Sequence, residues 1–118
     1  MNTKVLLADD QMKVRSALRL LLEQESDFVV SGETADATGL LLAVTEKEPD
    51  LLLLDWELPG LPTEQLLRLL KYERPSLKII AMSSHPEVEQ RVIGAGAHAF
   101  LSKSVTPEKV LAVIRSLG

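Results

Sequence analysis

Five short runs of hydrophobic residues recur along the chain, and longer mixed segments separate them. Each run is continuous rather than alternating, which is typical of parallel strands that are buried on both faces. The run 51–54 consists of leucine, which also favours helices, but its short length and the preceding Pro49-Asp50 favour a strand. We therefore expect strands at 5–8, 28–30, 51–54, 79–82 and, less clearly marked, 99–101.

Between the runs, hydrophobic residues recur every three or four positions, which is the spacing of an amphipathic helix. Asp36 is placed to cap the second of these segments, and Thr106-Pro107 introduces the last one as a cap and a first-turn proline. The fourth segment, roughly 86–93, is short and weakly amphipathic and ends at Gly94 and Gly96. The clear stripes are Val14, Ala17, Leu18, Leu21 and Leu22; Ala37, Leu40, Leu41 and Val44; Leu66, Leu67 and Leu70; and Val110, Val113, Ile114 and Leu117.

A strand followed by a helix, repeated five times, predicts an open parallel five-stranded sheet with helices on both faces. The 118 residues fit one domain by size, and no linker, repeat or low-complexity segment divides them. We therefore interpret 1–118 as one α/β domain, and we expect any output domain to lie outside this sequence.

Composition and charge narrow the range of functions. The 13 basic and 17 acidic side chains give a net charge of −4, and aromatic residues make up only 3%, so we expect no nucleic-acid binding by this domain. The chain has no cysteine, which excludes disulfides, thiolate metal sites and cysteine nucleophiles. Its first apolar stretch is too short for a signal peptide, and no run approaches the ~18 apolar residues of a membrane span, so we expect a cytoplasmic protein without membrane contact.

Polar side chains follow four of the predicted strands. Asp9 and Asp10 follow the first strand, Asp55 the third, Ser83 the fourth and Lys103 the fifth. Because the carboxyl ends of parallel strands share one edge of the sheet, where ligands of open α/β sheets bind, we expect these groups to converge. Taken alone, each residue is more often a helix cap, a turn residue or a solvated lysine, but the joint pattern favours a functional cluster.

The residue types in this cluster suit phosphoryl chemistry. Three neighbouring carboxylates repel one another unless cations join them, and Lys103 supplies only one positive charge. Oxygen ligands without histidine or cysteine suit Mg²⁺, which also accepts a phosphate as a ligand. A carboxylate beside such an ion can attack phosphorus to form an aspartyl phosphate, while a hydroxyl and a lysine hold the phosphoryl oxygens.

The chain resembles the receiver domains of bacterial two-component response regulators. Its motifs are most like those of the subgroup with helix-turn-helix output domains. The resemblance runs from Lys4 to about Leu117 and is carried by VLLADD at 5–10, LLDWELPG at 53–60, IIAMS at 79–83 and AGAHAFLSK at 95–103. It implies a flavodoxin-like (βα)5 fold and a sensor histidine kinase as partner. It also implies a signalling protein that catalyses only its own phosphorylation and dephosphorylation, rather than an enzyme with a free substrate.

The same resemblance implies a role for each acidic residue. Asp55 would be the phosphoacceptor and a metal ligand. Asp10 would bind Mg²⁺ directly and Asp9 mainly through water, and the backbone carbonyl of Glu57 would complete the protein ligands.

A switch is implied as well. The Ser83 hydroxyl and the Lys103 ammonium would bind the phosphoryl group, and the Phe100 ring would move inward as the hydroxyl is drawn to the phosphate. The fourth helix, fifth strand and fifth helix would then change as the output face, which is also the expected contact of a homodimer. Glu57 and His85 would flank the attacking water and tune the lifetime of the phosphate.

Several positions depart from the usual pattern of the family. Lys103 follows Ser83 by 20 positions, fewer than usual, so we expect a shortened or shifted fourth helix. Counting back at the usual spacing would select Ala81 as the hydroxyl position, whereas the strand pattern selects Ser83. Gln11 and Trp56 are unusual in their places, and Trp56 either packs beneath its loop or covers the site.

Three other functions remain open from the sequence. A pseudo-receiver would be an interaction module of the same fold without phosphorylation; the complete acidic set argues against it, and the shortened fourth segment argues weakly for it. A Mg²⁺-dependent phosphohydrolase would use the same residue types, but the chain is too short for a cap domain. A flavin carrier of this fold is disfavoured because Asp9-Asp10 would repel the phosphate of FMN.

Overall fold

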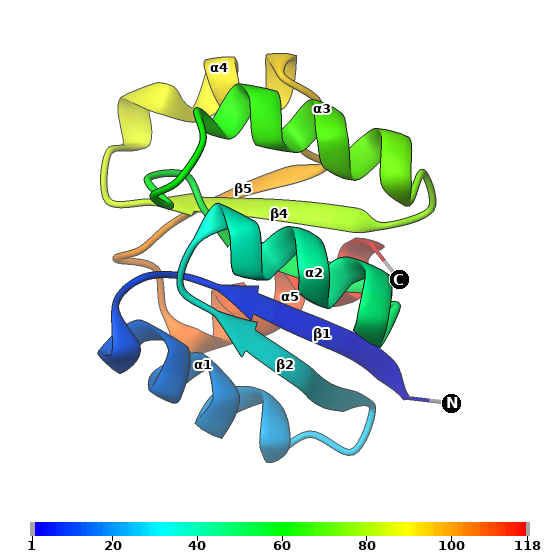
Figure 1. Ribbon diagram of the computed structural model, residues 1–118. Coiled ribbons are helices and arrows are strands. Elements are labelled where there is room, and N and C mark those ends of the chain that lie inside the picture. The colour runs from blue at the N-terminus through cyan, green and yellow to red at the C-terminus, as the bar shows by residue number, and fades with distance from the viewer. Residues whose placement is uncertain (1, 118) are drawn as a thin grey trace.

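The computed structural model describes residues 2–117, in which five strands alternate with five helices (Figure 1). All five predicted strands are confirmed, and each extends beyond its predicted bounds at one or both ends. Within this range, none of the helices combines the length and the apolar character that crossing a bilayer requires. The strands are β1 (Thr3–Ala8), β2 (Phe28–Thr34), β3 (Leu51–Asp55), β4 (Lys78–Ser83) and β5 (Ala99–Ser102). The helices are α1 (Met12–Glu23), α2 (Ala37–Lys47), α3 (Thr63–Glu73), α4 (Glu89–Gly94) and α5 (Pro107–Leu117), with a 3-10 turn at Pro86–Val88.

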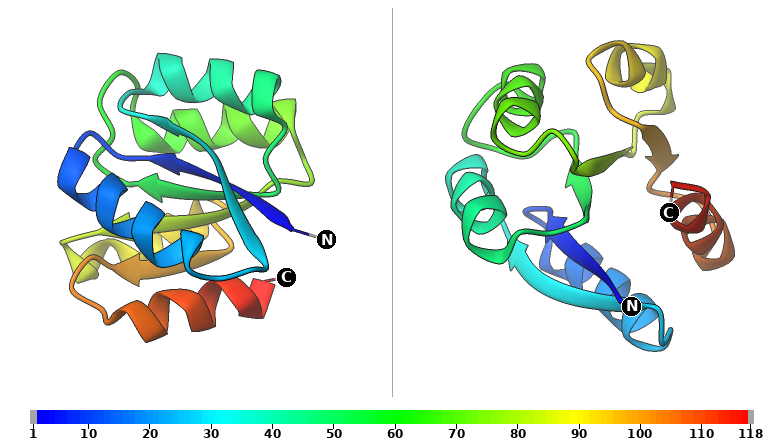
Figure 2. Two further views of the ribbon diagram at one scale, coloured as in Figure 1. Left: turned by 90° about the horizontal axis from the view of Figure 1, so that it is seen from below. Right: turned by 90° about the vertical axis from the view of Figure 1, so that its right-hand side faces the viewer.

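The strands form one parallel sheet in the order β2-β1-β3-β4-β5. Helices α2, α3 and α4 cover one face of the sheet, and α1 and α5 cover the other (Figure 2). Their buried side chains form a separate hydrophobic cluster on each face. This order and layering confirm the predicted flavodoxin-like (βα)5 fold. Because all the strands run in the same direction, their carboxyl ends lie at a single edge of the sheet.

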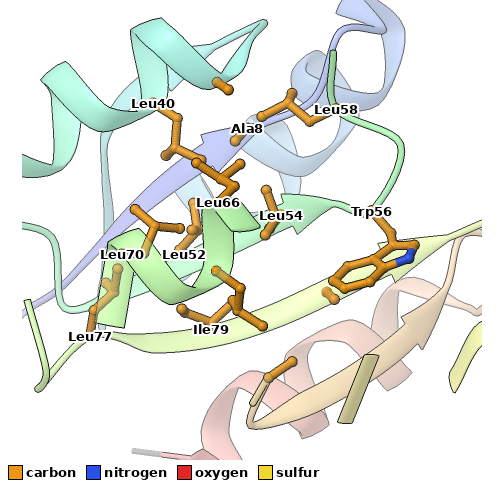
Figure 3. Packing of buried hydrophobic residues seen from close by; sticks show 14 of the residues in the cluster. Ala8, Leu40, Leu52, Leu54, Trp56, Leu58, Leu66, Leu70, Leu77 and Ile79 are labelled. Atoms are coloured by element: carbon orange, nitrogen blue, oxygen red, sulfur yellow. The ribbon is translucent and has the colours of Figure 1, made fainter. Parts of the chain in front are cut away.

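The central strand β3 explains why the leucine run is continuous. Leu52 and Leu54 enter the hydrophobic cluster beneath α2, α3 and α4, which we call the α2–α4 core. Leu51 and Leu53 enter the cluster beneath α1 and α5. Every position of β3 therefore faces a covered layer, and the strand needs apolar residues on both faces. Figure 3 shows part of the α2–α4 core, including Trp56.

Two expectations about burial are wrong. The strand β2 is not buried on both faces, since Val29 is 42% exposed. It lies at the edge of the sheet, where the helical layers cover only part of a strand. In α1, Ala17 belongs to the predicted stripe but is exposed, while Leu18 and Leu22 are buried against the sheet and Val14 and Leu21 pack partly buried beside them. The apolar face of α1 is therefore narrower than the spacing suggested.

The predicted helix caps are confirmed. The Asp36 carboxylate accepts a hydrogen bond from the backbone N–H of Gly39 at 2.7 Å and so satisfies a free amide at the start of α2. The hydroxyl of Thr106 accepts a hydrogen bond from the N–H of Lys109 at 3.3 Å, and α5 begins at Pro107. Both caps fix the point at which a loop leaving the carboxyl edge turns into a helix.

The fourth helix is shortened, as the spacing before Lys103 predicts. It has 6 residues, whereas the other four helices have 11 or 12. Two residues after its end, Gly96 adopts a φ of 112°, a left-handed backbone conformation that favours glycine. The end of the Lys71 side chain, from α3, lies where a side chain at position 96 would extend. The backbone conformation at Gly96 thus fixes the C-terminal end of α4.

We predict that Leu70→Ala lowers the free energy of unfolding by about 2–5 kcal/mol. Leu70 is fully buried in the α2–α4 core, so the truncation removes apolar contacts and leaves a cavity. Urea unfolding followed by far-UV circular dichroism measures the change. Leu42→Ala is the matched control on the neighbouring helix, since Leu42 is 59% exposed and its truncation should change stability by less than about 0.5 kcal/mol. Equal losses in the two variants would contradict the packing described here.

Candidate metal centre

The fold brings the polar residues of distant segments to the carboxyl edge of the sheet. Asp9 and Asp10 follow β1 directly, and Asp55 is the last residue of β3, the strand beside β1. Lys103 follows β5, whose neighbour β4 ends at Ser83. The predicted convergence is therefore a direct result of parallel strands that end in register.

Three carboxylates lie close together at this edge. One oxygen from each of Asp9, Asp10 and Asp55 lies within 4.8 Å of the others. Asp9 and Asp55 are 3% and 2% exposed, whereas Asp10 faces solvent. Buried carboxylates at this separation repel one another, so the site gains free energy from any cation that joins them.

Lys103 supplies the only cationic side chain in contact with these carboxylates among the described residues. Its Nζ lies 2.9 Å from Oδ2 of Asp9 and 3.3 Å from Oδ1 of Asp55. It also donates a hydrogen bond to Oε1 of Gln11 at 3.2 Å. Burial alone would lower the pKa of Lys103, but the hydrogen bond with Asp9 and the charge of Asp55 outweigh it and raise that pKa. The lysine is therefore a permanent cation in the site.

The surroundings of Asp55 raise the pKa of its carboxyl group. Burial raises the pKa of Asp55 to about 6, and the nearby charge of Asp9 acts in the same direction. The backbone N–H of Glu57, which donates to Oδ1 of Asp55 at 3.0 Å, and the charge of Lys103 oppose the rise without cancelling it. Asp55 is thus an ionised but poorly solvated carboxylate near neutral pH, which is favourable for a nucleophile.

Ser83, which the strand pattern favours as the hydroxyl position, is the last residue of β4. It is fully buried at the end of β4, and its carbonyl accepts a hydrogen bond from the N–H of Lys103 at 2.9 Å. Ala81, which the usual spacing would have selected, is buried in the α2–α4 core instead. Phe100 pairs with Ala81 across β4 and β5 and packs partly buried against the same core. The ring and the Ser83 hydroxyl therefore share one face of the sheet, because alternate residues of a strand point the same way.

A pocket of about 250 Å³ opens above the carboxylates. Trp56 does not line it; the indole is 7% exposed and packs in the α2–α4 core (Figure 3). Of the two positions expected for Trp56, the structure shows packing beneath the loop rather than a cover over the site. The pocket is lined by Asp10, Gln11, Asp55, Glu57, Ser84, His85 and Lys103.

The structure also adds contacts that sequence reasoning missed. Arg15, on the first turns of α1, donates a hydrogen bond to the backbone carbonyl of Asp9 at 2.5 Å and pairs with Glu33 at 3.0 Å. The amide side chain of Gln11 accepts from Lys103, as described above. The exposed Glu57 side chain reaches the Ser83 hydroxyl at 3.0 Å. No sequence spacing signals these contacts, since each depends on how a loop folds back over the edge.

The donor set fits a hard divalent cation. The carboxylate oxygens of Asp9, Asp10 and Asp55 offer the oxygen ligands that such ions prefer, and no histidine or cysteine joins them within the described residues. Three carboxylates face only one ammonium, and this excess of negative charge attracts a cation. The geometry supports a metal site without selecting among the hard divalent ions.

Comparison with known proteins agrees with this geometry. Residues 5–115 match the family described as "Response regulator receiver domain". The chain is 31% identical over 115 residues to the response regulator UvrY of Escherichia coli (strain K12), covering 96% of this chain and 53% of UvrY. It spans about half the length of the curated relatives that it matches.

Solved structures show the same similarity in three dimensions. A two-component response regulator of the LuxR family from Aurantimonas sp. SI85-9A1 has a TM-score of 0.90 at 25% identity, covering 99% of this chain and 85% of that one. The isolated receiver domain of RcsB from Salmonella enterica serovar Typhimurium, with the phosphomimetic BeF3⁻, has a TM-score of 0.85 at 27% identity, covering 98% and 90%. Sequence, fold and site agree, and the chain belongs to the response regulator receiver domain family.

Proposed function

We propose that residues 1–118 form one receiver domain whose Asp55 accepts a phosphoryl group from a sensor histidine kinase or a small acyl phosphate. As a member of this family, the chain is a signalling domain rather than a conventional enzyme. The observation that carries the proposal is the position of Asp55, buried at the carboxyl edge between Lys103 and two further carboxylates. In the transfer, an Asp55 oxygen forms a bond to phosphorus as the bond from phosphorus to the donor atom breaks; that atom is a histidine nitrogen in the kinase and an oxygen in the acyl phosphate.

Mg²⁺ is the cation that we assign to the acidic residues. Asp10 is exposed beside the pocket and is the candidate for direct coordination, together with Asp55 and the backbone carbonyl of Glu57. Asp9 is engaged by Lys103 and by the N–H of Gln11 at 2.8 Å, which supports contact with the ion through water. The bound ion would neutralise charge on the incoming phosphoryl group.

Ser83 and Lys103 are the donors that we assign to the phosphoryl oxygens. Lys103 borders the pocket directly, while the Ser83 hydroxyl lies at the base of the loop that carries His85. Movement of this hydroxyl toward the phosphate would leave space on the face where Phe100 packs, which supports Phe100 as the switch aromatic. Glu57 and His85 both line the pocket, so both are placed to affect the attack of water on the phosphate.

We infer that the output is read on the face formed by α4, β5 and α5. Ile93 on α4 is 43% exposed, and Leu111 on α5 is partly buried. These apolar groups suit a homodimer contact that forms when the phosphorylated state is populated. The match covers 53% of the response regulator UvrY. We propose that this domain, too, controls an effector.

We predict that acetyl phosphate with Mg²⁺ adds one phosphoryl group to the wild-type chain and none to Asp55→Asn. Intact-protein mass spectrometry measures the addition, and EDTA should abolish it because the carboxylates then lack their cation. Asp27→Asn is the matched control, since Asp27 pairs with Arg115 away from the pocket and should leave the addition unchanged. A wild-type chain that binds Mg²⁺ but accepts no phosphoryl group from acetyl phosphate or from a kinase would support the pseudo-receiver instead.

We predict that Asp55→Asn stabilises the metal-free protein by about 1–3 kcal/mol at pH 7.5. The folded state holds the pKa of Asp55 at about 6, above its unfolded value, so ionised Asp55 costs stability above that pH. The cost fades as the pH falls from about 6 toward 4, where the carboxyl is protonated in the folded protein. Urea unfolding in EDTA at pH 7.5 and pH 5 measures both values.

Adding Mg²⁺ to the same unfolding experiment tests whether Asp55 belongs to the metal site. It should raise the urea midpoint of the wild type at pH 7.5, since it neutralises the carboxylates only in the folded state. The gain should be smaller for Asp55→Asn, which lacks one of the three carboxylates. Equal gains in the two proteins would argue against Asp55 as part of the metal site.

We predict that phosphorylation with acetyl phosphate and Mg²⁺ increases the sedimentation coefficient of the wild type by forming a dimer. Ile93→Arg should prevent the increase by placing a charge in an apolar contact, without unfolding the monomer, because Ile93 is 43% exposed. Leu42→Arg, at an exposed position on α2 outside the proposed face, should dimerise like the wild type. An unchanged coefficient on full phosphorylation would remove the dimer from the proposal.

A further inference from the structure

The hydroxyl of Ser83 already donates its proton and accepts one hydrogen bond in this structure. Its oxygen accepts a hydrogen bond from the backbone N–H of His85 at 3.0 Å. Its single proton is donated to the carboxylate of Glu57, at 3.0 Å to Oε2 and 3.2 Å to Oε1. A serine hydroxyl has only one proton to donate, so Ser83 cannot bind Glu57 and a phosphoryl oxygen through that proton at the same time.

Glu57 is held in place for this contact. Its backbone N–H donates to Oδ1 of Asp55 at 3.0 Å, which fixes the residue beside the carboxylate that we assign as the phosphoacceptor. Its side chain is exposed and lines the pocket, yet its carboxylate lies against a hydroxyl that is 0% exposed. Water cannot easily replace Glu57 as the acceptor for a buried hydroxyl, so the contact is maintained until another acceptor enters the pocket.

We propose that Glu57 is a positioning residue that holds the Ser83 hydroxyl away from the phosphoryl group and thereby slows phosphorylation of Asp55. This inference rests on the proposed function and deepens it. It gives the Glu57 side chain a role through Ser83, separate from the backbone carbonyl that we assign to the metal. It also differs from a direct effect of Glu57 on the attacking water.

The timing of the contact determines which rate it affects. During transfer from acetyl phosphate, the bond between an Asp55 oxygen and phosphorus forms, the bond between phosphorus and the acetate oxygen breaks, and acetate leaves with the electron pair. For Ser83 to donate to the phosphoryl group at that stage, its hydrogen bond with Glu57 must already be broken. Loss of the Glu57 acceptor therefore speeds phosphorylation. Hydrolysis begins from a state in which Ser83 has already been released, so its rate is unaffected by this contact.

The charge of Glu57 must be separated from its hydrogen bond. Glu57→Gln removes the negative charge, which repels an anionic donor, but the amide oxygen can still accept from Ser83. Glu57→Ala removes both the charge and the acceptor. The ratio of the phosphorylation rates of the two variants therefore reports the effect of the hydrogen bond alone. Because Glu57 is exposed, both substitutions are compatible with the fold.

The test is a rate comparison with acetyl phosphate and Mg²⁺ in two backgrounds. With Ser83 present, we expect Glu57→Ala to be phosphorylated about fivefold faster than Glu57→Gln, the factor that corresponds to one ordinary hydrogen bond. The ratio should fall to about one in Ser83→Ala and return in Ser83→Thr, which restores the hydroxyl. The ratio of the dephosphorylation rates of the two Glu57 variants, measured after removal of the donor, should not depend on whether Ser83 is present, because this contact is already broken in the phosphorylated state.

Other outcomes overturn the inference. A ratio that persists in Ser83→Ala would show that Glu57 acts on the donor directly, and a ratio of one with Ser83 present would show that only its charge matters. A difference confined to dephosphorylation would place Glu57 on the path of the attacking water. Absence of phosphorylation in the wild type as well would overturn the proposed function itself, which separates that failure from failure of the positioning role.

Discussion

An imbalance of charge at one edge of the sheet governs the site. Asp9, Asp10 and Asp55 converge there, and Lys103 is the one cationic side chain that contacts them within residues 2–117. The fold supplies this arrangement at a cost, because two of the three carboxylates are almost completely buried. A bound cation would relieve this repulsion, whereas transfer of a phosphoryl group to Asp55 would add negative charge, so the transfer would depend on the bound cation.

The parallel sheet makes the imbalance possible. Neighbouring strands that end in register bring groups from positions 9, 55 and 103 together, although long stretches of sequence separate them. Hydrophobic clusters pack against both faces of the strands, so moving the strand ends apart to relax the repulsion would cost buried apolar contacts. Backbone N–H groups then take up part of the negative charge, since the amides of Gln11 and Glu57 each donate to a carboxylate two residues earlier.

Much of this structure could be predicted from the sequence because it depends on simple spacing. Continuous hydrophobic runs indicated the strands, and residues directly after them, such as Asp55 and Lys103, had to lie at the carboxyl edge. The exposure of Val29 could not be predicted in this way, because the order of the strands decides which of them lies at an edge. The contact of Glu57 with Ser83 was also missed, since it depends on the rotamer of an exposed side chain. Residue type alone could not decide whether Trp56 packs beneath its loop or covers the site; in the structure it packs in the α2–α4 core.

The short α4 is anchored unequally at its two ends. At its C-terminal end, the left-handed conformation of Gly96 sets the entry into β5, so an inserted residue there would shift Phe100 and Lys103 out of register. At its N-terminal end, the 3-10 turn Pro86–Val88 joins the helix to the loop after Ser83, and its residues are largely exposed. Insertions and deletions are therefore tolerated better before the helix than after it. A change in the length of this region would therefore be accommodated more readily at the end beside the Ser83 hydroxyl, which links the shape of the helix to the residue that would sense phosphorylation.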